Sequence, residues 1–172
     1  MNLPTASAKT PASAKTSASV KTPSTVKTPT SCAAPLPTSV KVVSILLDLT
    51  GAMTVVYWVL YFAAGAVQAE TSEIYIAFEN SFPAADAWMS AACFIGAAGL
   101  LLRRHWGLLF GICAGATMIF LGLMDVLFNL EQGMYAVMNG EMVFETLINV
   151  WTLGFGVFVL WFLWSRRKLL LN

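Results

Sequence analysis

Two apolar runs stand back to back between Asp86 and Asn129, joined only by the basic segment Arg103-Arg104-His105-Trp106. An apolar helix of roughly 20 residues crosses the ~30 Å hydrocarbon layer of a bilayer. The pair therefore predicts a transmembrane helical hairpin whose charged turn lies at a membrane surface. The orientation of this hairpin determines the orientation of every other segment.

A further apolar run lies on each side of the hairpin. The 172 residues are 58% apolar and only 11% charged, whereas soluble domains are about 25% charged. The sequence therefore predicts an all-α membrane protein, an up-down-up-down bundle of four transmembrane helices within residues 41–168. The expected spans are residues 42–67, 84–102, 106–130 and 142–164.

Residues 1–40 have a different composition. They contain six of the 7 prolines, no acidic residue, and a lysine-threonine pair that recurs every six residues from Lys9 to Thr28. A segment with so little apolar surface cannot offset the entropy of ordering, so we predict a disordered cytoplasmic tail. Its lysines also allow loose adhesion to anionic lipid.

The 10 basic residues fall before the first span, in the hairpin turn and after the last span, while the acidic residues avoid all three places. Because basic residues near span ends are retained in the cytoplasm, both termini are expected there and both acidic loops outside. The expected anchors of this topology are Arg103, Arg104, Arg166, Arg167 and Lys168.

Glycines recur along the third span, at Gly107, Gly111, Gly115 and Gly122. Small residues on one helix face let backbones approach closely, which is a main source of helix association in lipid. We expect tight packing of the second and third spans through this face. Continuing the stripe by steps of three and four reaches Asp125 and Asn129, which places both on the packed face.

Four carboxylates lie within or at the ends of apolar runs, namely Asp48, Asp86, Asp125 and Glu145. An Asp at the centre of a transmembrane helix costs about 2.5–3.5 kcal/mol on insertion scales, so such groups need a partner, water or a proton. Three of them are expected at the outer ends of their helices. They would converge there with Asn129 and Asn149.

Purely structural roles stay open for these acids. Asp86 follows Pro83 in a first turn, where a carboxylate suits the helix dipole, with Asn80 or Ser81 as the cap. Asp125 and Glu145 can form hydrogen bonds that only fix packing. Asp48 is expected to pair with Arg103 or Arg104.

The sequence offers no motif for catalysis, a cofactor, a metal or nucleic acid. There is one histidine, His105, so neither a paired haem site nor a zinc cluster is supported. The cysteines Cys32, Cys93 and Cys113 avoid the expected outer loops, so no disulfide framework is indicated. Cys93 and Cys113 are interpreted as small packing residues rather than a redox pair.

Several segments carry a resemblance. They are Phe78-Glu79-Asn80-Ser81-Phe82-Pro83, Ala85-Asp86-Ala87-Trp88, Gly99-Leu100-Leu101 with Trp106-Gly107, and Gly122-Leu123-Met124-Asp125 with Tyr135. Over about residues 78–135 the chain resembles small four-helix integral membrane proteins of prokaryotes that have no assigned activity. The resemblance implies a location in a prokaryotic cytoplasmic membrane.

Two functions are favoured at this stage, and a membrane enzyme that acts on a lipid or quinone through Asp/Glu acid–base chemistry is a third possibility. The first is non-enzymatic binding or passage of a small solute, proton or lipid headgroup at an acidic site at the outer mouth. The second is assembly, in which the glycine-rich faces bind a second copy or another membrane protein and the acids fix register. In both, the lipid bilayer is the immediate partner.

Overall fold

The computed structural model describes residues 35–65, 72–137 and 139–171. Most of the lysine-threonine tail lies outside the described residues. Within them the structure consists of four long helices with short connecting elements. The long helices are α1 (Thr38–Ala64), α3 (Pro83–Leu101), α4 (His105–Glu131) and α5 (Gly140–Ser165), and the short ones are α2 (Glu73–Glu79), η1 (Met134–Ala136) and α6 (Arg167–Leu171).

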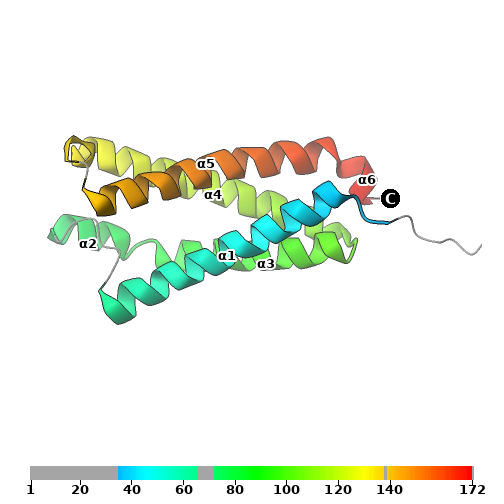
Figure 1. The fold of residues 1–172 in the computed structure, drawn as a ribbon, viewed down its shortest axis with the longest axis horizontal. Helices are drawn as coiled ribbons and strands as arrows, with labels where there is room; N and C mark the ends of the chain where they lie inside the picture. Colours follow the sequence, from blue (N-terminus) through cyan, green and yellow to red (C-terminus); the bar gives the residue numbers. More distant parts are fainter. Residues whose placement is uncertain (1–34, 66–71, 138, 172) are drawn as a thin grey trace, which may run out of the picture. The chain divides into compact units, whose positions relative to one another are not determined.

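The expected all-α fold class is confirmed. Four helical segments are long and apolar enough to cross a membrane, the second of them being α2 and α3 together over Glu73–Leu101. Figure 1 shows α1, α3, α4 and α5 alternating in direction, so the bundle is up-down-up-down. The first helix differs at both ends from its expected span, because it begins directly after Pro37 and ends at Gly65, whose φ is +58°.

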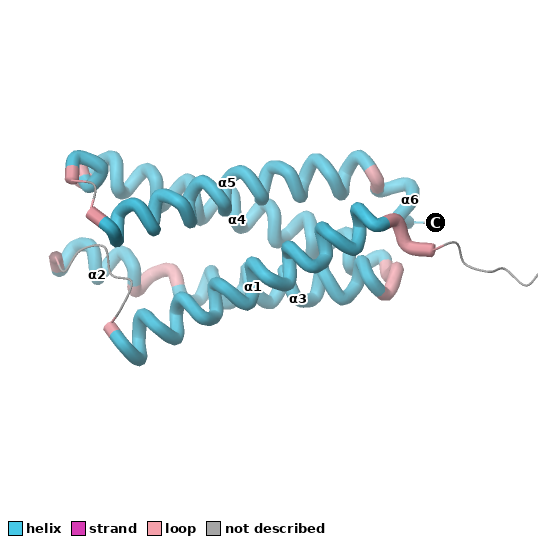
Figure 2. The backbone as a smooth tube through the Cα atoms, viewed as in Figure 1, coloured by secondary structure: helices cyan, strands magenta, loops and turns pink. Residues whose placement is uncertain are grey.

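The four long helices pack in chain order. α1 lies along α3, α3 along α4, and α4 along α5. Within the described residues, α1 and α5 have no comparable contact along their length. Two hydrogen bonds join them, from Arg166 Nη1 to Ser39 Oγ (2.6 Å) and from Trp151 Nε1 to Thr50 Oγ1 (3.2 Å). Toward the end that holds α2 the two helices diverge, as Figure 2 shows.

Glycines set the spacing of α3, α4 and α5. The backbones of Gly99 and Gly107 approach so closely that a Cβ on either would collide with the other helix. Farther along α4, a Cβ at Gly115 would lie 3.0 Å from the carbonyl oxygen of Gly156 on α5. A Cβ at Gly122 would lie 3.0 Å from Cγ of Leu153. The glycines of α4 therefore serve two neighbours, α3 near the turn and α5 beyond it.

The turn between α3 and α4 is closed by backbone hydrogen bonds. The amide of Arg103 donates to the carbonyl of Leu100 (3.2 Å), and that of Arg104 donates to Gly99 (2.8 Å). This is the pattern of a Schellman motif, in which the residue after the cap is left-handed and most often glycine. Here that residue is Arg103, with φ +53°.

The close approach at Gly107 leads to a stability prediction. Gly107→Ala inserts a methyl group into the α3 backbone, and we expect the free energy of unfolding to fall by about 1–3 kcal/mol. Gly154→Ala is the matched control, because a Cβ there meets no atom within 4 Å. An alanine in that helix should raise the unfolding free energy by about 0.5–1 kcal/mol. Thermal unfolding of both variants in detergent, followed by circular dichroism, tests this. Melting temperatures that shift in the same direction for both variants would contradict it.

Candidate functional site

A cavity of about 420 Å³ lies between α1 and α5, bounded by α3 and α4. It occupies the half of the bundle in which α1 and α5 diverge. Four carboxylates line it, one from each of α2, α3, α4 and α5. They are Glu79, Asp86, Asp125 and Glu145. We call the end of the bundle that holds these four residues the acidic end.

Carboxamides on α4 and α5 hold two of these acids. Asn149 Nδ2 donates to Asp125 Oδ2 at 2.6 Å, and Asn129 Nδ2 donates to Glu145 Oε1 at 2.5 Å. Each helix therefore supplies one acid and one amide, in crossed pairs. Since Glu145 and Asn149 are four residues apart, they share one face of α5, which the packing at Gly122 brings against α4.

The short helix α2 covers the acidic end. Phe78 stacks on Phe128 of α4, with ring centroids 3.8 Å apart. Tyr75, one turn earlier on the same side of α2, is buried, and its hydroxyl donates to Glu145 Oε2 at 3.3 Å. Glu79 is also buried, and it accepts from the Tyr57 hydroxyl of α1 at 3.4 Å. α2 thus packs inward and turns Tyr75 and Glu79 toward the acidic end.

Trp58 and Asp86 form a partition inside the bundle. Trp58 Nε1 donates to Asp86 Oδ2 at 2.8 Å, joining α1 to the first turn of α3. Both residues line the cavity and also a second hollow of about 580 Å³ on the other side, between α1 and α3. Asp86 therefore has a tertiary partner in addition to its place near a helix N-terminus. Neither Asn80 nor Ser81 caps that helix, because α3 begins after Phe82 with no side-chain cap.

Three buried polar atoms near the carboxylates have no hydrogen-bond partner among the described residues. They are Tyr61 Oη, Ser90 Oγ and Asn129 Oδ1. Asn129 is 0% exposed, and its carboxamide lies directly on the carboxylate of Glu145. A buried acceptor without a donor costs about 1–3 kcal/mol, so the Glu145 side of the cavity is short of donors.

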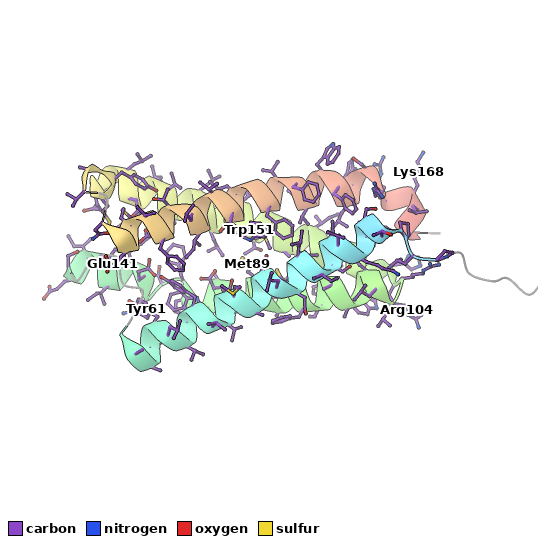
Figure 3. All side chains as sticks on the ribbon, in the orientation of Figure 1. Tyr61, Met89, Arg104, Glu141, Trp151 and Lys168 are labelled. Atoms are coloured by element: carbon purple, nitrogen blue, oxygen red, sulfur yellow. The ribbon has the colours of Figure 1, made fainter. Side chains whose placement is uncertain are left out.

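Basic residues gather at the opposite end of the bundle. Figure 3 shows Arg104 and Lys168 there, with Glu141 and Tyr61 at the acidic end and Trp151 and Met89 between. The described residues that line the cavity include no lysine, arginine or histidine. Within the described part of the chain, no three acidic, histidine or cysteine side chains are grouped so that they could hold a metal ion. The arrangement suits a ligand that brings positive charge or donor hydrogens on an organic group.

Among the residues singled out from the sequence, Asp86, Asp125, Glu145 and Asn149 line the cavity, and Asn129 contacts it through Glu145. Asp48 differs, because it lies on the exposed side of α1 and is not part of the lining. Its ion pair with Arg103 or Arg104 stays a prediction. The expected packing glycines of α4 are all buried.

Sequence reasoning missed Glu79 and its aromatic partners. From the sequence alone Glu79 falls in an acidic loop between two expected spans, and no role was predicted for Tyr57, Trp58 or Tyr75. The signal was the four-residue spacing of Tyr75 and Glu79 on a helix whose other side carries Ile74, 62% exposed. That spacing puts the two polar groups on one inward face.

No protein-family model, curated protein or solved structure matches this chain. Its function must therefore be inferred from the site itself.

The crossed pairs lead to a second prediction. Asn149→Leu leaves Asp125 without its donor in a setting with little water, so the unfolding free energy should fall by about 1–3 kcal/mol. Asp125→Leu combined with Asn149→Leu removes both polar groups and should recover most of that loss. Unfolding midpoints in detergent test the pair, and a double variant less stable than Asn149→Leu alone would contradict the pairing.

Proposed function

We propose that this chain is a non-enzymatic integral membrane protein that binds a small organic cation or cationic headgroup at its acidic end. The observation that carries this proposal is the composition of the cavity, whose described lining has four carboxylates from four helices and no basic side chain. Charges buried in hydrocarbon need counter-charges, and the described chain keeps its own cations at the other end.

The aromatic walls favour an ammonium group over a bare metal ion. Tyr57 and Trp58 of α1, and Phe144 and Trp151 of α5, line the same cavity. Aromatic faces attract ammonium groups by about 0.5–2 kcal/mol, more where water is excluded. The acidic groups sit apart on four helices, held by hydrogen bonds from Trp58, Asn129 and Asn149. They surround a volume rather than a single coordination point.

The assembly alternative finds less support. Its expected partner surface was the glycine-rich face of α4, with Gly107, Gly111, Gly115 and Gly122. All four are buried against α3 or α5 of the same chain. A second copy or another membrane protein would therefore need a different face.

Binding of tetramethylammonium tests the proposed function. Quenching or enhancement of the fluorescence of Trp58 and Trp151 should report occupancy in detergent. Asp125→Asn and Glu145→Gln should each weaken binding by about tenfold, since a hydrogen bond or close pair with a charged group contributes about 1.5–3 kcal/mol.

Glu141→Gln is the matched control, because Glu141 begins the same helix as Glu145 but is exposed and outside the lining. It should bind like the unaltered chain. Saturation that is unchanged by Asp125→Asn and Glu145→Gln would overturn the proposal. If tetramethylammonium does not bind at all, the proposal is wrong, and proton exchange at the carboxylates becomes the next hypothesis.

We also propose that the acidic end faces away from the cytoplasm. The α3–α4 turn and the Arg166–Lys168 segment lie at one end, opposite the carboxylates (Figure 3). Basic residues beside spans remain on the cytoplasmic side. The two ends of the bundle, before α1 and after α5, would then both face the cytoplasm, and the proposed location is a prokaryotic cytoplasmic membrane.

A fusion experiment tests this orientation. A reporter that is active only outside the cytoplasm should be inactive when fused after Lys168 and active when inserted after Gly133. Gly133 lies between α4 and α5, with φ +67°, and a Cβ there meets nothing within 4 Å, so an insertion has space. The reverse pattern would contradict the proposed orientation.

A further inference from the structure

We infer that the ligand is a single-chain amphiphile with a cationic head, and that it enters the cavity sideways from the bilayer between α1 and α5. This inference rests on the proposed function and adds the class of ligand and its route. Three features carry it: the open side of the cavity, its length, and the separation of its polar and apolar parts.

The cavity is continuous with the lipid-facing surface. Its α1 wall includes Leu49, Met53, Val56 and Leu60, which are 43–58% exposed although they line the cavity. Its α5 wall includes Leu147, which is 61% exposed. In a membrane these exposed apolar side chains face acyl chains. The edge of the cavity between the two helices therefore opens to lipid.

The dimensions suit one alkyl chain with a small head. Lining residues extend from Leu49 to Leu60 along α1, which corresponds to about 17 Å of helix. A volume of about 420 Å³ spread over that length gives a narrow space. It lies near the lower end of the ~300–1,000 Å³ found for small-molecule pockets. A long, narrow volume of this size favours a single-chain ligand over a lipid with two chains.

Polar and apolar groups are separated along this length. The Trp151–Thr50 hydrogen bond closes the inner end, where the other lining groups are mostly apolar. Tyr57, which bonds Glu79, and Glu145 itself lie seven and six residues farther along their helices, about 9–10 Å away. Asp125, held by Asn149, lies between these two levels. A head held by Glu79 and Glu145 at the outer level would leave its tail pointing along the cavity toward Trp151.

A second copy of the chain is a poorer occupant of the opening. Two copies inserted in the same orientation would meet at the same depth in the membrane, with the acidic end of one beside the acidic end of the other. Each would bring carboxylates, rather than a cation, to the neighbour's acidic end. Charge complementarity therefore favours a cationic amphiphile, and a partner copy becomes an outcome of the test.

The test compares tetramethylammonium with octyltrimethylammonium in dodecyl maltoside micelles. Leu147→Trp and Met53→Trp enlarge exposed side chains on the two edges of the opening and need no repacking of the interior. Leu127→Trp is the matched control, because Leu127 is 52% exposed on α4 but outside the lining. Binding is followed by tryptophan fluorescence, with an octyl chain brominated at its end to quench a nearby indole.

We expect the octyl compound to bind at least tenfold more tightly than tetramethylammonium, and its bromine to quench Trp151. This quenching should disappear in Trp151→Phe. Leu147→Trp and Met53→Trp should weaken binding of the octyl compound at least tenfold more than they weaken binding of tetramethylammonium, and Leu127→Trp should change neither affinity.

Other outcomes separate the two proposals. If both compounds bind and the two edge variants change nothing, lateral entry is overturned and the proposed function stands. If neither compound binds, both fail. If light scattering gives a dimer and cysteines placed at positions 53 and 147 crosslink between copies, the opening is a subunit interface and the inference is overturned.

Discussion

The arrangement of this bundle depends on close backbone contact between helices at glycine. In hydrocarbon, apolar side chains gain nothing by leaving lipid for each other, so helix association depends on van der Waals fit and polar contacts. α4 has glycine contacts on two sides, to Gly99 of α3 and to Gly156 of α5. These three helices form the closely packed part of the structure. α1 joins it along α3, where Gly51 faces Cys93.

The cavity follows from this unequal packing. α5 is held to α4 at Gly115 and Gly122, and α1 is held to α3. On the acidic side of the Thr50–Trp151 hydrogen bond, no side-chain hydrogen bond joins α1 directly to α5 among the described residues. The same α4–α5 contact brings Asp125 opposite Asn149 and Asn129 opposite Glu145. These polar groups would be costly in lipid, and they line the cavity on the side where α1 and α5 diverge. The glycine contacts of α4 thus determine both how the helices pack and where these polar groups lie.

Sequence patterns predicted the helices well because apolar length alone nearly determines a transmembrane span. They also predicted that Asp86, Asp125 and Glu145 would come together, since helix direction places all three at one end. They could not reveal the opening between α1 and α5, which depends on which pairs of neighbours pack. Nor did they identify Glu79, whose role depends on α2 folding inward over Phe128. Asp48 appeared equally unusual in sequence, yet its rotation around α1 directs it outward.

Arg103 combines an unfavourable backbone conformation with a positive charge. Its left-handed conformation ends α3 in a position where glycine would be relaxed and a side chain costs about 1–2 kcal/mol. Glycine there, however, would remove one of the two arginines of the α3–α4 turn. A relaxed backbone and a positive side chain are therefore mutually exclusive at residue 103.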